Sequence, residues 1–414
     1  MKPRPLEGRT VVDLTTALAG PYATLLLAGL GATVIKVENP GTGGDAARGN
    51  PPYAAPDGPS LGRPGDTGMS VSMLGRGRGK LSVTLDLKHP RAGEVFADLV
   101  RGADIVVENY AAGTADRLGV GYAAARAANP RIVYTSISGF GAQGPGDGGG
   151  TGKAMDTIIQ ALSGVMLTAG EPDDPPVRFG LPIGDLLAPL YAVIGTLAAV
   201  VQAERTGEGQ HVDVSMLGAL TSLLSAEPFD ALEALGAPTR TGALVPRLAP
   251  FGLFPAADGW IALCAPTDAF ARGVCTAIGR PELAADDRFA TRDDRVRNAD
   301  ELHELIRGWS SARTRAEAVG ELAAAGVPAA AVRDPAEAVR DPGVLARGEV
   351  VELEHPDHGP TGLMGPGVPI TFSGARTGPD RPVPRLGQHN AEVFGGLLGY
   401  TADRLADLER EGVL

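Results

Sequence analysis

The sequence has very little cysteine and no excess of positive charge. Among its 414 residues only Cys264 and Cys275 are cysteines, so a disulfide framework is excluded. The formal net charge of −12 argues against a nucleic-acid partner, although a local basic pocket for one anionic ligand is compatible with it. A composition that is 43% hydrophobic and 21% charged is ordinary for a soluble globular protein.

A long uninterrupted apolar run is also missing. The longest, Leu186 to Val201, is broken by Pro189 and is short for a bilayer span, so it predicts a buried core helix. No positively charged and then apolar leader precedes Leu6. These features predict a cytoplasmic protein that does not enter a membrane.

Histidine is scarce and scattered, with six in the whole chain. Only His355 and His358 are close in sequence, and a single H-x-x-H is a weak metal signal. We therefore expect no metal site.

A Gly-Lys pair at Gly152 and Lys153 invites comparison with a phosphate-binding P-loop. That motif needs a glycine where this chain has Asp147, and a serine or threonine where it has Ala154. The comparison therefore fails, and the pattern argues against ATP-type phosphate chemistry.

The N-terminal half alternates segments typical of strands with segments typical of helices. Short apolar or alternating runs predict strands at 11–14, 32–38, 82–87, 104–108, 132–137 and 211–216. Strand, helix, strand at this rhythm implies parallel pairing with right-handed crossovers. We therefore predict an open, doubly wound α/β domain.

The middle of the chain changes character. FGLFPAADGWIALCA predicts a hairpin with Asp258-Gly259 at its turn, and helical patterns follow it as far as residue 325. Residues 222–325 are therefore predicted to form a smaller α+β domain after a large domain over 1–221. Short strand-like runs such as VPITFS return in 326–414, but the pattern leaves open whether they rejoin the large domain.

Two aspartates each open a helical run, and 185 − 156 places them 29 residues apart. Asp156 and Asp185 both stand where a helix N-cap is expected, in the positive field of the helix dipole. A purely structural capping role is the simplest interpretation of either residue alone.

Basic and polar side chains follow several of the predicted strands and loops. Arg78 and Lys80 enter one strand, Asn109 follows the next, Arg117 comes after it, and Lys153 closes a Gly-rich loop from 139 to 152. Glycine-rich backbone lets N–H groups approach an anion closely, and ligands bind at the carboxyl ends of parallel strands. Each cation alone could be a solvated surface charge, but together they suit a ligand with several phosphates.

Six stretches in order resemble one family over nearly the whole chain. They are AGPYATLLLAGLGATVIKVENPGTGGD, RGRGKLSVTLDLKHP, ADIVVENYAAGTADRLGVGY, NPRIVYTSISGFGAQGP, RTGEGQHVDVSM and LGQHNAEVFGGLLGY. Together they look like the family III CoA-transferases, whose fold α-methylacyl-CoA racemase shares. The resemblance implies a Rossmann-like large domain built from both chain ends, with 326–414 returning to it, and an interlocked homodimer.

The resemblance also implies roles for named residues. Asp185 matches the family's catalytic aspartate, and Asp156 matches a recurrent supporting carboxylate. Lys80, Arg117 and Lys153 fall on positions that contact CoA, and Arg78 and Asn109 are assigned to the same binding set.

The implied reaction moves CoA from an acyl-CoA donor to an acceptor carboxylic acid. The donor thioester would be attacked by Asp185, giving an aspartyl anhydride and then an aspartyl-CoA thioester. Coenzyme A enters as part of the substrate, and no metal, ATP or redox cofactor is required.

Two other functions fit the same resemblance. Racemases of this fold need a histidine where this chain has Met155 and a glutamate where we align Thr267, so one face of the substrate would lack a general base. A CoA-binding subunit without turnover would not need Asp185. The transferase is therefore favoured.

The acyl site departs from formyl-CoA transferase, which has a glutamine in place of Leu18 and a glycine run in place of GALVPRLAP. We therefore expect a more apolar acyl pocket, formed by Leu18, Ala243, Leu244 and Val245, that favours a larger or less polar acyl group. His389 has no assigned chemistry, and a structural role is favoured for it.

Overall fold

The computed structural model describes residues 2–65, 68–146, 152–245 and 247–414. The chain folds into two compact units. The large unit contains 1–165, 178–226 and 339–414, and the small unit contains 166–177 and 227–338. The predicted boundaries at 222 and 325 differ from this division by a few residues at one end and about a dozen at the other.

A six-stranded parallel sheet forms the centre of the large unit, in the order β5-β2-β1-β6-β7-β8. The strands are β1 (Thr10–Asp13), β2 (Thr33–Glu38), β5 (Lys80–Thr84), β6 (Ile105–Glu108), β7 (Val133–Ser138) and β8 (His211–Ser215). This order reverses direction between β1 and β6, as in doubly wound nucleotide-binding sheets. The predicted parallel α/β sheet is confirmed.

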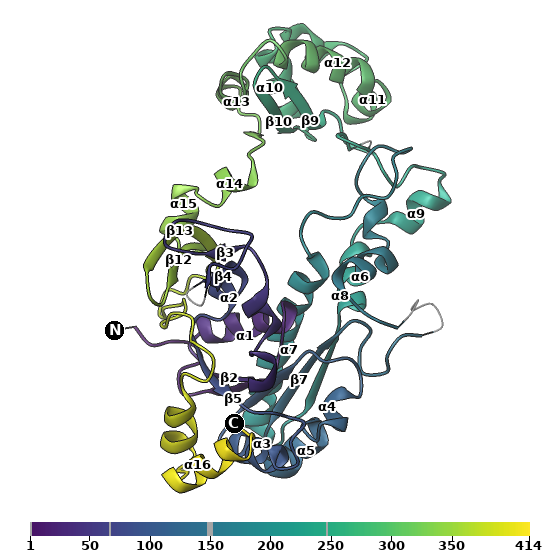
Figure 1. Cartoon of the computed structure of the whole chain (residues 1–414). Helices are drawn as coiled ribbons and strands as arrows, with labels where there is room; N and C mark the ends of the chain where they lie inside the picture. The colour runs from purple at the N-terminus through teal and green to yellow at the C-terminus, as the bar shows by residue number, and fades with distance from the viewer. Residues whose placement is uncertain (1, 66–67, 147–151, 246) are drawn as a thin grey trace. The chain divides into compact units, whose positions relative to one another are not determined.

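Helices cover both faces of this sheet (Figure 1). Val12 points into a core with α3 (Ala92–Arg101), α5 (Tyr122–Ala128), the π-helix Ala391–Leu397 and α16 (Ala402–Arg410). Val11 points into the opposite core, with α1 (Ala19–Gly29), α6 (Asp156–Ser163), α7 (Ile183–Thr206) and α8 (Met216–Leu224). Alternate strand residues thus serve alternate faces, which is why the strands are apolar on both sides.

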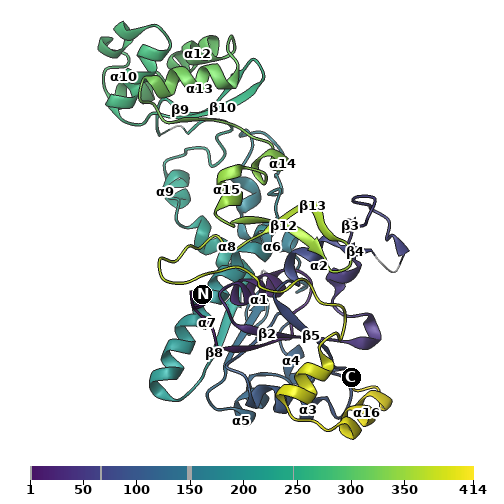
Figure 2. The same ribbon diagram turned by 90° about the vertical axis from the view of Figure 1, so that its left-hand side faces the viewer.

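The large unit also contains several shorter helices and strands. They are β3 (Tyr53–Ala54), β4 (Met69–Ser70), α2 (Val71–Arg76), α4 (Thr114–Arg117), α15 (Pro342–Ala346), β12 (Val350–His355) and β13 (Gly359–Pro366). Except for α4 and α15, these elements meet in one small apolar core, and Figure 2 shows the β12–β13 hairpin next to α2. The strand expected at 368–373 does not form, and the last strand of the chain, β13, ends at Pro366. Pro369 has no backbone N–H to donate to a neighbouring strand, which disfavours a strand there.

The C-terminal segment closes the open edge of the sheet at β5. His389 donates its backbone N–H to the Ser82 carbonyl, and its Nδ1 accepts the Ser82 N–H at 3.1 Å. The side-chain amide of Asn390 accepts the Thr84 N–H through Oδ1 and donates to Thr84 Oγ1 through Nδ2. The structural role expected for His389 is therefore seen in its contacts with this strand.

The small unit has its own core around a three-stranded antiparallel sheet (Figure 2). Its elements are α9 (Phe229–Ala234), β9 (Phe251–Ala256), β10 (Gly259–Cys264), α10 (Asp268–Ala277), α11 (Arg292–Arg297), α12 (Ala299–Ser310), α13 (Arg315–Ala324), β11 (Ala329–Ala331) and α14 (Pro335–Ala338). β9 and β10 pair as the hairpin that the sequence predicts.

Candidate active site

A cavity of about 850 Å3 lies at the carboxyl ends of β1, β6 and β7, where the strand order reverses. In doubly wound sheets this is the usual ligand site, because the loops of neighbouring strands diverge there. Loops after the three strands and the first turns of α1, α6 and α7 supply its wall. The cavity contains Asp185, Asp156, Lys153, Asn109 and Leu18, so it gathers five of the predicted site residues.

Asp185 is the third residue of α7, one turn deeper than the predicted N-cap position, because the helix already begins at Ile183. Among the described residues, none donates a hydrogen bond to its carboxylate. Burial and the charge of Asp156 raise the pKa of Asp185 to about 6, against an opposing effect of Arg76. At neutral pH the group is therefore an ionised, poorly solvated carboxylate that faces a cavity.

Asp156 is likewise the first residue of α6 and not its N-cap, which is Met155. Its carboxylate caps a different helix. Oδ1 accepts the backbone N–H of Gly184 at 2.8 Å and that of Asp185 at 3.4 Å. A Cβ on Gly184 would stand 3.1 Å from this oxygen, so the Gly-Asp pair lets the two helix ends approach closely.

Gln160 is a site residue that the sequence analysis missed. It is fully buried on α6, and its Nε2 donates to Asp156 Oδ2 at 2.8 Å and to the Leu181 carbonyl at 3.1 Å. Its Oε1 accepts the Phe179 N–H at 2.9 Å. One amide thus fixes Asp156 and the segment that leads into α7. Asp156 and Gln160 are four residues apart on one helix face, a spacing at which such pairs meet.

The turn between β1 and α1 is held in a strained conformation. Ala17 has φ of 66°, and its N–H donates to Asp45 Oδ1 at 2.9 Å. Asn109 clamps the preceding residue, accepting the Thr16 N–H and donating to the Thr16 carbonyl. Such backbone strain of about 1–3 kcal/mol is held where surrounding contacts fix it, often at functional sites. Asn109 therefore lines the cavity and also shapes it.

The first turn of α1 opens onto the same cavity. Leu18 is its N-cap and carries no capping side chain, so the first N–H groups of the helix have no side-chain acceptor within the described chain. Helix N-termini of this kind attract negative charge.

Lys80, which was predicted to contact CoA, lies in the core of the large unit. It is fully buried, and its ammonium donates to Asp13 Oδ2, the Pro21 carbonyl and Thr24 Oγ1, which uses all three protons. Burial lowers the pKa of Lys80 to about 8, although Asp13 opposes that effect. The structure therefore places Lys80 in the core and not at a ligand surface.

Arg78, which was predicted to belong to the same CoA-binding set, is also buried. Its guanidinium donates to the carbonyls of Gly75 and Pro366, which joins α2 to β13. Burial lowers its pKa to about 10. Neither Arg78 nor Lys80 lines any of the described cavities near Asp185.

Arg117 lies at the surface, outside the main cavity. Apart from a hydrogen bond to Thr114 it is unpaired within the described chain, and it lines a cavity of about 440 Å3 together with Lys88. Lys88 also lines a third cavity, of about 250 Å3, that shares Tyr110 with the main one. The three cavities therefore follow one another from Arg117 to Asp185. Lys88 was not predicted.

The predicted acyl-pocket residues are divided between the two units. Leu18 lines the main cavity. Ala243, Leu244 and Val245 belong to the small unit, where Leu244 packs against that unit's own core. The contribution of these three residues to the acyl site stays a prediction.

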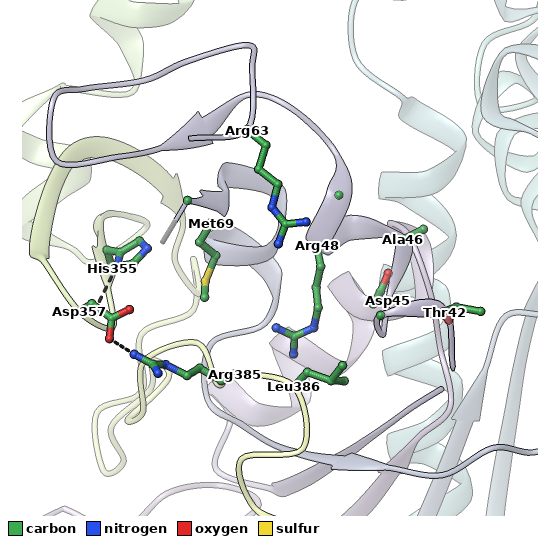
Figure 3. Close-up of a pocket in the computed structure, with 13 residues that line it drawn as sticks. Thr42, Asp45, Ala46, Arg48, Arg63, Met69, His355, Asp357, Arg385 and Leu386 are labelled. Atoms are coloured by element: carbon green, nitrogen blue, oxygen red, sulfur yellow. Dashed lines mark hydrogen bonds and ion pairs between the residues drawn. The ribbon is translucent and has the colours of Figure 1, made fainter. Parts of the chain in front are cut away.

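A second large cavity, of about 710 Å3, lies beside the β12–β13 hairpin (Figure 3). Two of the three arginines that line it are paired with acids. Arg48 makes two hydrogen bonds to Glu38, and Arg385 donates to Asp357. Neither Asp185 nor Asp156 lines it. The chemistry is therefore assigned to the cavity that contains the two aspartates.

Among the described residues, the wall of the main cavity carries no second base of the racemase type. Met155 lines it at the predicted position, and no histidine is among its described wall residues. Thr267 caps α10 in the small unit. Over the described ranges, no group of three histidine, cysteine, aspartate or glutamate side chains could hold a metal ion.

Comparisons with known proteins find similar sequences and structures over nearly the whole chain. Residues 6–390 match the family described as CoA-transferase family III. The succinate–glutarate CoA-transferase of Agrobacterium fabrum is 35% identical over 397 residues, covering 95% of this chain and 96% of that protein. The succinyl-CoA:mesaconate CoA-transferase of Haloarcula hispanica is 38% identical over 390 residues, covering 94% and 95%. A crystal structure of a CAIB/BAIF family protein from Brucella suis superposes with a TM-score of 0.80 at 33% identity, covering 96% of this chain and all of that one.

Proposed function

Because this chain belongs to CoA-transferase family III and is an acyl-CoA:carboxylate CoA-transferase, we propose that Asp185 is its covalent nucleophile. The observation that carries this proposal is an ionised carboxylate without a hydrogen-bond donor among the described residues, facing the 850 Å3 cavity. A carboxylate whose pKa is raised by burial is a stronger nucleophile than an ordinary one, and it remains ionised at pH 7.5.

The reaction proceeds in two halves. Asp185 attacks the thioester carbonyl of the donor and expels CoA thiolate, leaving an acyl-aspartyl anhydride. The thiolate then attacks the aspartyl carbonyl, which releases the donor acid and leaves an aspartyl-CoA thioester. The acceptor carboxylate attacks the aspartyl carbonyl of that thioester and expels CoA thiolate, leaving a second anhydride. The thiolate then attacks the acyl carbonyl of the acceptor, which releases the new acyl-CoA and frees the Asp185 carboxylate.

Each tetrahedral intermediate places negative charge near the first turn of α1. The backbone N–H groups of Ala19 and Gly20 lie in this turn without side-chain acceptors in the described chain and are the proposed oxyanion donors. A donor of this kind lowers the activation free energy by about 3 kcal/mol in comparable enzymes. Asp156 acts by fixing the first turn of α7 and not by attack, because its carboxylate is occupied with N–H groups.

The proposed position of CoA follows the three successive cavities. A thioester end at Asp185 leaves room for the pantetheine arm past Tyr110 and for the phosphates near Lys88 and Arg117. Two cations at the surface suit phosphate groups. Lys153, which is exposed at the main cavity, supplies a third positive charge along the thiol end.

The acids are proposed to be short dicarboxylic acids. The relatives above are named for succinate, glutarate and mesaconate, each of which carries two carboxylates. The proposal of dicarboxylic acids replaces the expectation of a larger or less polar acyl group, since Lys153 and Arg178 line the same cavity as Leu18.

We further propose that the enzyme is a cytoplasmic, interlocked homodimer. Large apolar side chains are exposed on three helices that pack together in the large unit: Ile158 and Leu162 on α6, Leu190, Ile194 and Val201 on α7, and Leu223 on α8. Exposed apolar groups on this scale are typical of an interface, and a second copy would cover them. α7 has the length and composition of a membrane span but packs into the core of the large unit, so we assign its outer face to the partner.

Trapping of the acyl-enzyme tests the nucleophile. Enzyme incubated with an acyl-CoA and hydroxylamine is expected to carry a hydroxamate at Asp185, located by peptide mass spectrometry. Asp185→Ala is expected to lose both the label and acyl exchange. Exchange that continues in this variant, or a label on another residue, contradicts the proposal.

A further inference from the structure

Arg178 is a cation in the main cavity to which the proposed reaction assigns no task. The described wall of this cavity carries four charged side chains: Lys153, Arg178, Asp156 and Asp185. Asp185 is the proposed nucleophile, and Asp156 is bonded to backbone N–H groups and to Gln160. In the described parts of the chain, Arg178 makes no ion pair or side-chain hydrogen bond, so its guanidinium is available to a ligand.

The backbone next to Arg178 is fixed to the catalytic frame. Gln160, which is fully buried, accepts the N–H of Phe179 and donates to the carbonyl of Leu181. The same amide bonds Asp156, which holds the first turn of α7. Hydrogen bonds within the large unit thus tie the segment that follows Arg178 to the helix end that presents Asp185.

The charge of the cavity requires a cation if the acyl group is itself anionic. A dicarboxylic acyl-CoA brings a free carboxylate into a space that already contains two aspartates. Repulsion between these like charges would oppose binding, and a guanidinium offsets it with two parallel N–H bonds to one carboxylate.

We propose that Arg178 binds the distal carboxylate of a dicarboxylic acyl substrate and thereby selects dicarboxylic over monocarboxylic acids. This inference rests on the proposed function of Asp185 in the same cavity. The methylene groups of the substrate would lie along Leu18, between the two charged ends. Arg178 is thus a specificity residue of the acyl site, with no part in bond making.

Identity exchange is a suitable assay because it requires no knowledge of the natural donor. Labelled succinate is exchanged with succinyl-CoA and labelled butanoate with butanoyl-CoA, two acids that differ by one carboxylate, and glutarate with pentanoate gives a second pair. The variants are Arg178→Met, Arg178→Lys and, as a matched control, Arg205→Met. Arg205 is an exposed arginine in the last turn of α7 that does not line the main cavity.

Wild type is expected to prefer the dicarboxylic member of at least one pair. Arg178→Met should lower kcat/KM for that member about 100-fold, the usual effect of losing a charged contact, and leave the monocarboxylic rate within about threefold. Arg178→Lys should retain part of the preference, and Arg205→Met all of it.

Two results would overturn this assignment. One is an equal loss for both members of the pair, and the other is a wild type that prefers the monocarboxylic acid in each pair. Hydroxylamine trapping, run with succinyl-CoA in wild type and in Arg178→Met, separates the two proposals. A hydroxamate at Asp185 in both proteins with unchanged acid preference refutes only the role of Arg178, whereas its absence in wild type refutes the nucleophile.

Discussion

Replacing Asp185 with asparagine is expected to stabilise the fold at neutral pH while it abolishes acyl exchange. Burial and the neighbouring Asp156 raise the pKa of Asp185 from 3.8 to about 6. A difference of about two pKa units at about 1.4 kcal/mol each corresponds to about 3 kcal/mol of destabilisation in the ionised state. The carboxylate is partly open to the cavity, so we expect a gain of about 2 kcal/mol for the neutral amide.

The sign of this effect depends on pH. Between about pH 4 and pH 6 the folded carboxyl retains its proton while the unfolded one has lost it, so the stability of the wild type falls as pH rises through this window. Below pH 4 both states are protonated, and the advantage of asparagine should vanish. The gain of Asp185→Asn is therefore expected to be full at pH 7.5 and nearly absent at pH 4.

Urea midpoints at pH 7.5 and pH 4, measured at equal protein concentration, test this expectation. Asp230→Asn is the matched control, because Asp230 also lies in the first turn of a helix, α9, but is exposed to solvent. It should change the midpoint little at either pH. A midpoint for Asp185→Asn that falls at pH 7.5, or rises equally at both pH values, would refute the idea that a buried charge is held at this site at a cost in stability.

Four further substitutions separate the roles assigned above. Asp156→Asn removes the negative charge next to Asp185, so the pKa of Asp185 should fall. The acid limb of the pH profile of kcat/KM should then move to a pH lower by about one unit. Gln160→Met removes three hydrogen bonds and is expected to lower kcat about tenfold, with the KM for CoA thioesters unchanged. Arg117→Met should raise the KM for CoA thioesters about tenfold, and a smaller effect with dephospho-CoA thioesters would place Arg117 at the 3′-phosphate. Lys80→Met should cost about 3 kcal/mol of stability, because it leaves Asp13 buried without its partner, and a selective rise in the KM for CoA thioesters would contradict its placement in the core.

The sequence was sufficient for the sheet but not for the burial of every side chain on it. Apolar residues in short runs predict strands, and all six strands form within a few residues of their predicted positions. On β5, Lys80, Ser82 and Thr84 alternate with apolar residues and suggest a face exposed to water. All five residues of that strand are buried, because Lys80 donates to the Pro21 carbonyl of α1 and the segment around His389 pairs with Ser82. Hydrogen bonds between segments more than three hundred residues apart leave no local pattern.

The sequence predicted several residues of the candidate site but not the hydrogen bonds that connect them. Asp156 and Asp185 were expected to cap their own helices, since that is the local rule for an acid at the start of a helix. Instead one carboxylate caps the other residue's helix, which follows from how α6 and α7 meet in space. Gln160 could have been found, because an Asp-x-x-x-Gln spacing places both side chains on one helix face.

The cross-helix cap explains why two acids, and not one, belong in this cavity. A lone aspartate in the first turn of α7 would face the free N–H groups of the helix end, which favour the ionised form and lower its pKa. Burial is the main cause of the raised pKa of Asp185, and Asp156 adds to it, because it occupies the N–H groups of Gly184 and Asp185 and brings a negative charge of its own. The nucleophile is thereby left without donors from the described chain and with a raised pKa, which makes it more reactive toward a thioester carbonyl. The same loss of stabilisation makes the aspartyl anhydride easier to reach from the free carboxylate.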